Sequence, residues 1–118
     1  MRARRGLRFA TALNAATRVS AARMELTERA DGVTIINDAF NANPDSTRAA
    51  LKSLVAIGRS RGARTWAVLG EMLELGDTSA DEHDAIGRLV VRLDVNRLLV
   101  VGAGAKPIHL GASLGVFP

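Results

Sequence analysis

Short polar side chains follow an apolar run at a point where they could bind a nucleotide. Residues 33–36 (VTII) are β-branched and apolar, and residues 37–43 (NDAFNAN) come directly after them. Such a run predicts a strand buried on both faces, and ligands of open α/β sheets lie beyond the carboxyl ends of strands. There the Asp38 carboxylate could accept hydrogen bonds from two hydroxyl groups of a ribose, with Asn41 and Asn43 beside it. On residue types alone, a plainer interpretation is favoured, in which Asp38 forms a turn and Asn43 caps a helix.

A second group of chemically capable residues follows the next apolar run. Residues 65–69 (TWAVL) predict a strand, and the loop after it carries Glu71 and Glu74. Met72, Leu73 and Leu75 of this loop are expected to pack rather than to contact a substrate. A carboxylate in a cleft could attract the ammonium group of a substrate, and solvated surface charges are an equally good interpretation. His83 falls in the first turn of a predicted helix, where the helix dipole favours the neutral imidazole. This histidine could orient a substrate, but a position on the helix surface fits the sequence at least as well.

The elements that would position these residues alternate between strand and helix. Asn43 and Pro44 predict the start of a helix that ends at Arg61-Gly62, and residues 79–82 (SADE) predict a capping box on the next helix. This order predicts an α/β fold, a mostly parallel sheet with flanking helices. With so few parallel strands, the sheet is expected to be incomplete. The strands are expected at residues 23–28, at an edge of the sheet, and at residues 33–36, 65–69 and 97–102, which are expected to be buried.

Composition and charge exclude several classes of protein. The absence of cysteine excludes a disulfide scaffold and a thiolate metal site, and no metal ligand set is predicted. No apolar run approaches the ~20 residues of a membrane span, so no membrane insertion is expected. The net charge of +4 falls to −2 over residues 25–118, because residues 1–24 carry six arginines and no acid. No nucleic-acid partner is therefore predicted, since the basic charge belongs only to the N-terminal segment. That segment is either a transit peptide or, as we favour, the solvated end of a helix from a larger protein.

The order of these segments resembles the C-terminal domain of the Mur ligases. The matching pieces are RME at 23–25, DAFNANPDS at 38–46 and VLGEMLELG at 68–76, followed by His83. Together, at this spacing, the two longer pieces are specific, and the resemblance covers about residues 23–106.

Three positions within these pieces refine the resemblance. Phe40 replaces the usual tyrosine, and Glu71 replaces an aspartate with the charge kept. Other Mur ligases have a histidine at the position of Asn41. With asparagine at this position, the chain resembles the branch of the family that adds D-alanyl-D-alanine to UDP-N-acetylmuramoyl-tripeptide.

The resemblance implies a domain division and an activity. Residues 1–22 would be a remnant of a preceding central ATPase domain and its linker. Residues 23–118 would be a Rossmann-like C-terminal domain, truncated at its C-terminal end. The implied protein is a cytoplasmic, ATP-dependent, amide-forming ligase of peptidoglycan synthesis. Its Mg²⁺ ligands and phosphate loop would lie in the missing central domain, since the chain has no G-x-x-x-x-G-K-[ST] motif. The isolated chain is therefore expected to be inactive.

The resemblance also implies roles for individual residues. Arg23 and Asp38 would hold the ribose, and Asn41 and Asn43 would line the nucleotide side of a cleft. The substrate side would be lined by Glu71, Glu74 and His83. Two other functions stay open: a non-catalytic nucleotide- or partner-binding α/β module, and another ligase of the Mur or folylpolyglutamate type.

Overall fold

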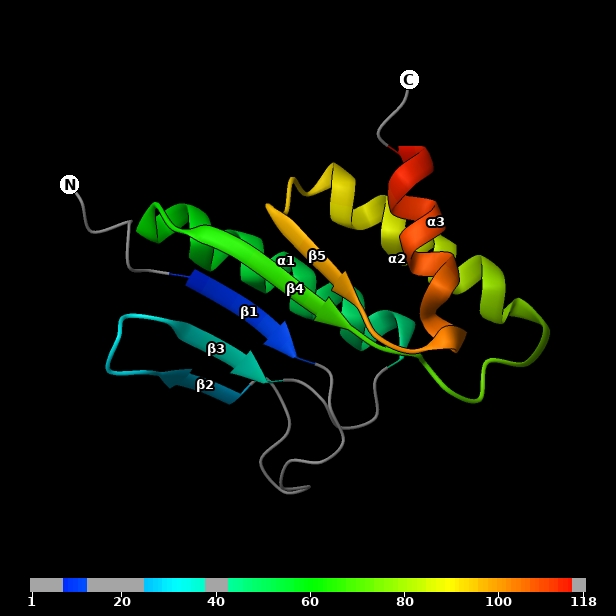
Figure 1. Ribbon diagram of the computed structural model, residues 1–118, viewed down its shortest axis with the longest axis horizontal. Coiled ribbons are helices and arrows are strands. Elements are labelled where there is room, and N and C mark those ends of the chain that lie inside the picture. The colour runs from blue at the N-terminus through cyan, green and yellow to red at the C-terminus, as the bar shows by residue number, and fades with distance from the viewer. Residues whose placement is uncertain (1–7, 13–24, 38–42, 116–118) are drawn as a thin grey trace.

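A single mixed sheet organises the computed structural model shown in Figure 1, which describes residues 8–12, 25–37 and 43–115. Its five strands have the order β2-β3-β1-β4-β5. Strands β3, β1, β4 and β5 run parallel, and β2 pairs antiparallel with β3 at one edge, which confirms the predicted edge strand. The strands are β1 Arg8–Ala12, β2 Glu25–Glu28, β3 Thr34–Asn37, β4 Arg64–Leu69 and β5 Arg97–Val100.

Strand β1 corrects the expectation for the N-terminal segment. Residues 8–12 are a strand between β3 and β4, and not the helix expected there. In the register, Thr11 is the partner of both Ile36 and Ala67. Little in the sequence indicates a strand here, because these five residues contain one β-branched side chain and lie among arginines. Part of residues 1–22 thus belongs to this sheet, and the domain boundary after residue 22 stays a prediction.

The described residues form three α-helices: α1 (Pro44–Arg61), α2 (Ser79–Arg92) and α3 (Lys106–Gly115). Short 3-10 turns, η3 (Gly76–Thr78) and η4 (Ala103–Ala105), precede α2 and α3. Helix α1 begins and ends as predicted. Its last turn is closed by Gly62, whose φ of 61° is the left-handed conformation that glycine adopts at little cost. None of the described helices is long and apolar enough to cross a membrane.

The core lies between the helices and one face of the sheet. Along β4, Thr65, Ala67 and Leu69 are buried, whereas Trp66 and Val68 between them are only partly buried. Figure 1 shows α1 crossing behind the sheet, and the main apolar cluster joins this helix and α2 to the buried side of the strands. The cluster comprises Ile36, Leu51, Leu54, Ala67, Leu69, Met72, Ile86, Leu89, Val90, Ala105 and Ile108.

This one-sided packing corrects the prediction of strands buried on both faces. In β3, Thr34 and Ile36 are buried while Ile35 is partly buried. In β5, Leu99 keeps half of its surface exposed. A continuous apolar run therefore looks the same in sequence whether one or both of its faces are covered.

Helices α2 and α3 cross with their backbones in contact. A Cβ atom on Gly87 would overlap the carbonyl oxygen of Ile108, and one on Gly111 would overlap that of Asp84. Each glycine is therefore required by the close approach of the other helix. This crossing fixes the direction of α2, and with it the position of its N-terminal turn beside the end of β4.

Candidate functional site

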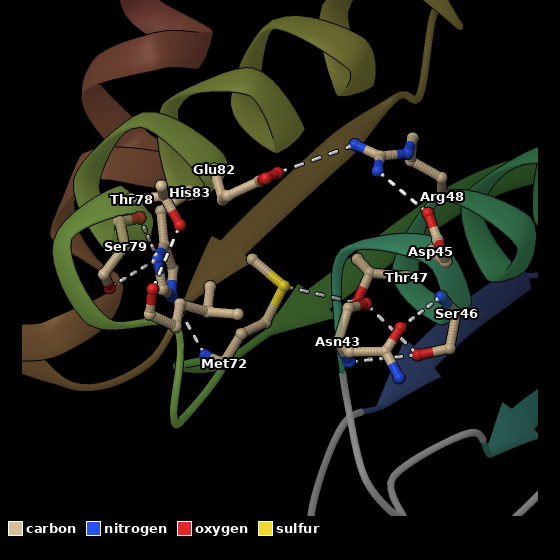
Figure 2. A network of polar contacts seen from close by, with 11 residues as sticks. Asn43, Asp45, Ser46, Thr47, Arg48, Met72, Thr78, Ser79, Glu82 and His83 are labelled. Atoms are coloured by element: carbon tan, nitrogen blue, oxygen red, sulfur yellow. Dashed lines mark hydrogen bonds and ion pairs between the residues drawn. The ribbon is translucent and has the colours of Figure 1, made fainter.

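The first turns of α1 and α2 and the loop after β4 converge near the carboxyl end of β4 (Figure 2). On the α1 side, the Asn43 side-chain oxygen accepts a hydrogen bond from the Ser46 amide at 2.8 Å. The Ser46 hydroxyl in turn accepts from the Asn43 amide at 3.0 Å. This reciprocal pair is a capping box, so the predicted capping role of Asn43 is confirmed. Its predicted place on the nucleotide side stays a prediction.

Arg48 links the two helices at the surface. Its guanidinium lies 3.0 Å from the Asp45 carboxylate on its own helix and 3.9 Å from the Glu82 carboxylate on α2. All three side chains are at least partly exposed, so water screens both pairs and each contributes little stability. The arrangement nevertheless leaves Glu82 directed toward Arg48, and not back toward the start of its own helix (Figure 2).

The start of α2 differs from the predicted capping box. Ser79 is the first helical residue, and the N-cap is Thr78, which makes no side-chain capping hydrogen bond. The Thr78 hydroxyl instead donates to the Leu75 carbonyl at 3.0 Å. The capping box predicted from the Ser-x-x-Glu spacing is therefore wrong. Ser79 could cap α2 only if the helix began at Ala80, and it begins one residue earlier, at Ser79 itself.

His83 is fully buried, with none of its surface exposed. Its Nε2 accepts a hydrogen bond from the Met72 amide at 2.9 Å. Its Nδ1 lies 2.7 Å from the Ser79 carbonyl oxygen, which can only accept, so Nδ1 carries the proton. The side chain is thus a neutral imidazole with both nitrogens bonded to the main chain.

This geometry changes the interpretation of His83. A place on the helix surface is wrong, because the ring is enclosed in the core. A direct substrate contact would need a ring nitrogen that the main chain already uses. What His83 does in the structure is hold the loop between β4 and α2 through Met72.

In the loop after β4, the buried side chain of Met72 lies between exposed neighbours. Met72 is 1% exposed and belongs to the core, which confirms its predicted packing role. Its sulfur lies 3.7 Å from the Thr47 hydroxyl of α1. Glu71, Leu73 and Glu74 are exposed, and Leu73 is 68% exposed, so its predicted packing role is wrong. Glu74 has a φ of 63°, a left-handed conformation that costs energy in a residue with a side chain.

Glu71 lies against the loop that follows β5. A Cβ atom on Gly104 would overlap the Glu71 carboxyl group, so the missing side chain at 104 makes room for this carboxylate. Glu71 is exposed at this position. Its predicted contact with substrate, like that of Glu74, stays a prediction.

Three predicted site residues, Arg23, Asp38 and Asn41, lie outside the described residues. Their ribose and nucleotide roles therefore stay predictions. Among the residues that the structure does describe, no group of three or more His, Asp or Glu side chains could hold a metal ion.

Sequence reasoning missed Ser46, Thr47 and Arg48, which all contribute to this site. The signal for Ser46 was present, because it stands three residues after the Asn43 cap, the spacing of a capping box. No comparable local signal marks Thr47, whose partner Met72 is distant in sequence.

Comparison with known proteins defines the family of this α/β domain. The family described as "Mur ligase, glutamate ligase domain" matches residues 22–115, so the chain belongs to the Mur ligase family. Similar curated proteins carry the name UDP-N-acetylmuramoyl-tripeptide–D-alanyl-D-alanine ligase. The chain is 58% identical to that of Mycobacterium tuberculosis over 109 residues. It is 54% identical to that of Mycobacterium leprae over 115 residues and 36% identical to that of Bacillus subtilis over 98 residues.

These matches cover 89%, 87% and 80% of this chain but 21%, 22% and 20% of the respective relatives. The chain therefore spans about a fifth of the length of the curated relatives that it matches. No solved structure matches it.

Proposed function

We propose that this chain is the Rossmann-like C-terminal domain of a cytoplasmic, ATP-dependent ligase of peptidoglycan synthesis. The ligase joins D-alanyl-D-alanine to UDP-N-acetylmuramoyl-tripeptide. The observation that carries the proposal is the 58% identity over 109 residues to a relative that bears this name. Family membership supports the amide-forming chemistry, and the identity supports the choice of substrates.

The proposed reaction has two steps. A carboxylate oxygen of the tripeptide attacks the γ-phosphorus of ATP, and ADP leaves to give an acyl phosphate. The amine of D-alanyl-D-alanine then attacks the acyl carbon, phosphate leaves, and the amine loses a proton as the amide forms. Mg²⁺ would stabilise the phosphoryl charge, and the family resemblance implies that its ligands lie in the central domain. No cluster among the described residues fits the ion. The contribution of this domain is therefore positioning and closure.

The geometry near the carboxyl end of β4 supports this division of labour. The first turn of α1, held by the Asn43–Ser46 capping box, presents one rigid helix N-terminus on the proposed nucleotide side. The loop after β4 presents the exposed carboxylates of Glu71 and Glu74 on the proposed amine side. Carboxylates there would attract the ammonium form of the dipeptide and raise its local concentration.

A chimaera tests the proposal directly. Residues 8–115 of this chain, which include β1, replace the corresponding segment of the Mycobacterium tuberculosis ligase. Amide formation is measured with ATP, the UDP-linked tripeptide and D-alanyl-D-alanine. We expect a turnover number within about tenfold of the parent, since a 58% identical domain keeps the proposed contacts. A folded chimaera that binds nucleotide without ligating would overturn the proposal and favour a non-catalytic binding module.

Matched charge variants of the chimaera test the carboxylates. We expect Glu71→Gln and Glu74→Gln each to raise KM for D-alanyl-D-alanine by about threefold to tenfold, with KM for ATP unchanged. Asp77→Asn is the control, because Asp77 is also exposed but lies in η3, beyond the loop. Equal effects from all three variants would show that only bulk charge matters.

A further inference from the structure

His83 makes contacts that its place in a helix does not require. A helix-surface histidine would face solvent, whereas this ring is fully buried and bonded to the main chain at both nitrogens. One bond stays inside α2, to the Ser79 carbonyl in the preceding turn. The other crosses to the Met72 amide in the loop after β4 (Figure 2). His83 is thus a bridge between a helix and a loop.

The bridge depends on one protonation state and one tautomer. Only a ring with its proton on Nδ1 can donate to the Ser79 carbonyl and still accept from the Met72 amide at Nε2. The Met72 amide is buried with its residue, so without Nε2 it would be an unpaired donor away from water. The bond therefore selects the loop conformation in which Met72 points into the core.

Fixing Met72 also fixes its neighbours. The Met72 side chain lies in the apolar cluster and contacts the Thr47 hydroxyl of α1. Met72 is held at both its amide and its sulfur, and Glu71 and Glu74 on the same loop are exposed, with the Glu71 carboxyl group lying against Gly104. The unfavourable φ of Glu74 shows that the surroundings impose this conformation on the loop.

We propose that His83 is a positioning residue whose neutral, Nδ1-protonated ring holds the Met72 amide and so sets the orientation of Glu71 and Glu74 toward the amine substrate. The orientation toward the amine rests on the proposed function. The bridge between His83, Met72 and Thr47 does not, and it also ties the amine side of the site to the first turn of α1.

The tautomer is tested in the 118-residue chain without any mutation. Long-range proton–nitrogen NMR spectra distinguish a protonated from an unprotonated imidazole nitrogen. We expect His83 to show a protonated Nδ1 and an unprotonated Nε2 near neutral pH. His109 is the internal control, because it is exposed and should average between forms. A His83 ring protonated at Nε2 would overturn the proposal.

Two substitutions separate the two bonds of the ring. In His83→Gln, the new side-chain oxygen reaches the place of Nε2 and can accept from Met72. In His83→Asn, the shorter side-chain amide reaches only the place of Nδ1 and serves only Ser79. We expect hydrogen exchange at the Met72 amide to be about tenfold or more faster in His83→Asn than in His83→Gln.

The control for folding is hydrogen exchange at the Leu54 amide, in the core of α1, which should be equal in the two variants. Equal exchange at Met72 in both variants would reduce His83 to a packing residue.

The chimaera extends the test to catalysis. We expect His83→Asn to raise KM for D-alanyl-D-alanine several-fold more than His83→Gln, with KM for ATP unchanged in both. Equal KM values for the two variants in an active chimaera would overturn the orienting role. If the chimaera forms no amide at all, the proposed function fails, while the exchange difference at Met72 still decides the structural bridge.

Discussion

Helices α1 and α2 begin side by side but are held by different means. Helix α1 carries its own start signal: Asn43 and Ser46 cap each other, and Pro44 needs no hydrogen-bond partner for its nitrogen. Helix α2 has no side-chain cap, and its first turn is instead held by His83, which bonds to Ser79 and to the loop before it. The start of α1 therefore depends on neighbouring residues, whereas the start of α2 depends on a tertiary contact. We expect mutations at the two helix starts to differ in their effect.

The largest expected effect comes from removing the tertiary anchor of α2. His83→Ala should lower the free energy of unfolding of the chain by about 3 kcal/mol, because it leaves a cavity in the core and an unpaired Met72 amide. Urea unfolding followed by the fluorescence of Trp66, the single tryptophan, measures it. His109→Ala, at an exposed site, should change little. A loss below about 1 kcal/mol for His83→Ala would contradict the conclusion that His83 anchors the start of α2.

The next effect concerns the close contact between α2 and α3 at Gly87. Gly87→Ala should cost about 2 kcal/mol, because its new methyl group would overlap the Ile108 carbonyl and push α3 away. Gly115→Ala is the matched control, since its Cβ would meet its neighbours at 3.6 Å or more, an ordinary contact. Thermal unfolding of both variants measures the difference, and an equal loss in the two would contradict the close helix crossing.

A smaller effect compares the two helix starts directly. Asn43→Ala should cost about 1 kcal/mol, because it removes the side-chain cap of α1. Ser79→Ala should cost less than about 0.5 kcal/mol, because Ser79 caps no amide and its hydroxyl makes only a long contact of 3.4 Å with His83 Nδ1. Chemical unfolding of the two alanine variants in parallel gives the difference. If Ser79→Ala proved as harmful as Asn43→Ala, the predicted capping box on α2 would have to be restored.

The smallest expected effect has the opposite sign. Glu74→Gly should raise the free energy of unfolding by about 0.5 kcal/mol, because glycine adopts a positive φ without strain. Asp94→Gly is the control, since Asp94 has a φ of 65° just after α2, away from the proposed site. We expect both variants to gain stability in differential scanning calorimetry, and only Glu74→Gly to weaken dipeptide use in the chimaera. A loss of stability for Glu74→Gly would mean that its side chain makes a structural contact.

Those features of the fold that rest on neighbouring residues could be predicted from the sequence. The start and end of α1, at Asn43 and Gly62, follow from capping chemistry within a few positions. Strand β2 at the edge and the parallel pairing of β4 and β5 also agree with the sequence pattern. Strand β1 could not be found in this way, because its place between β3 and β4 is decided by pairing with distant residues.

The candidate site was predictable to a smaller extent. Asn43 was identified as a cap from its spacing to Pro44, and Met72 as a packing residue from its type. The burial of His83 was not readable, because a histidine in a first turn has the same sequence signature on either face of the helix. The roles of Arg23 and Asp38 depend on the resemblance alone and still need a measurement.

The backbone contact between α2 and α3 also affects the order in which the segments of the chain fold. These helices are close in sequence, separated only by β5 and short turns, so their contact closes a short loop at small entropic cost. The pairing of β1 with β4 joins residues that are far apart in the sequence, such as Arg8 and Arg64, and must wait for a larger part of the chain. We therefore expect the segment from Ser79 to Gly115 to assemble first during refolding, with the strands at the other edge added onto it.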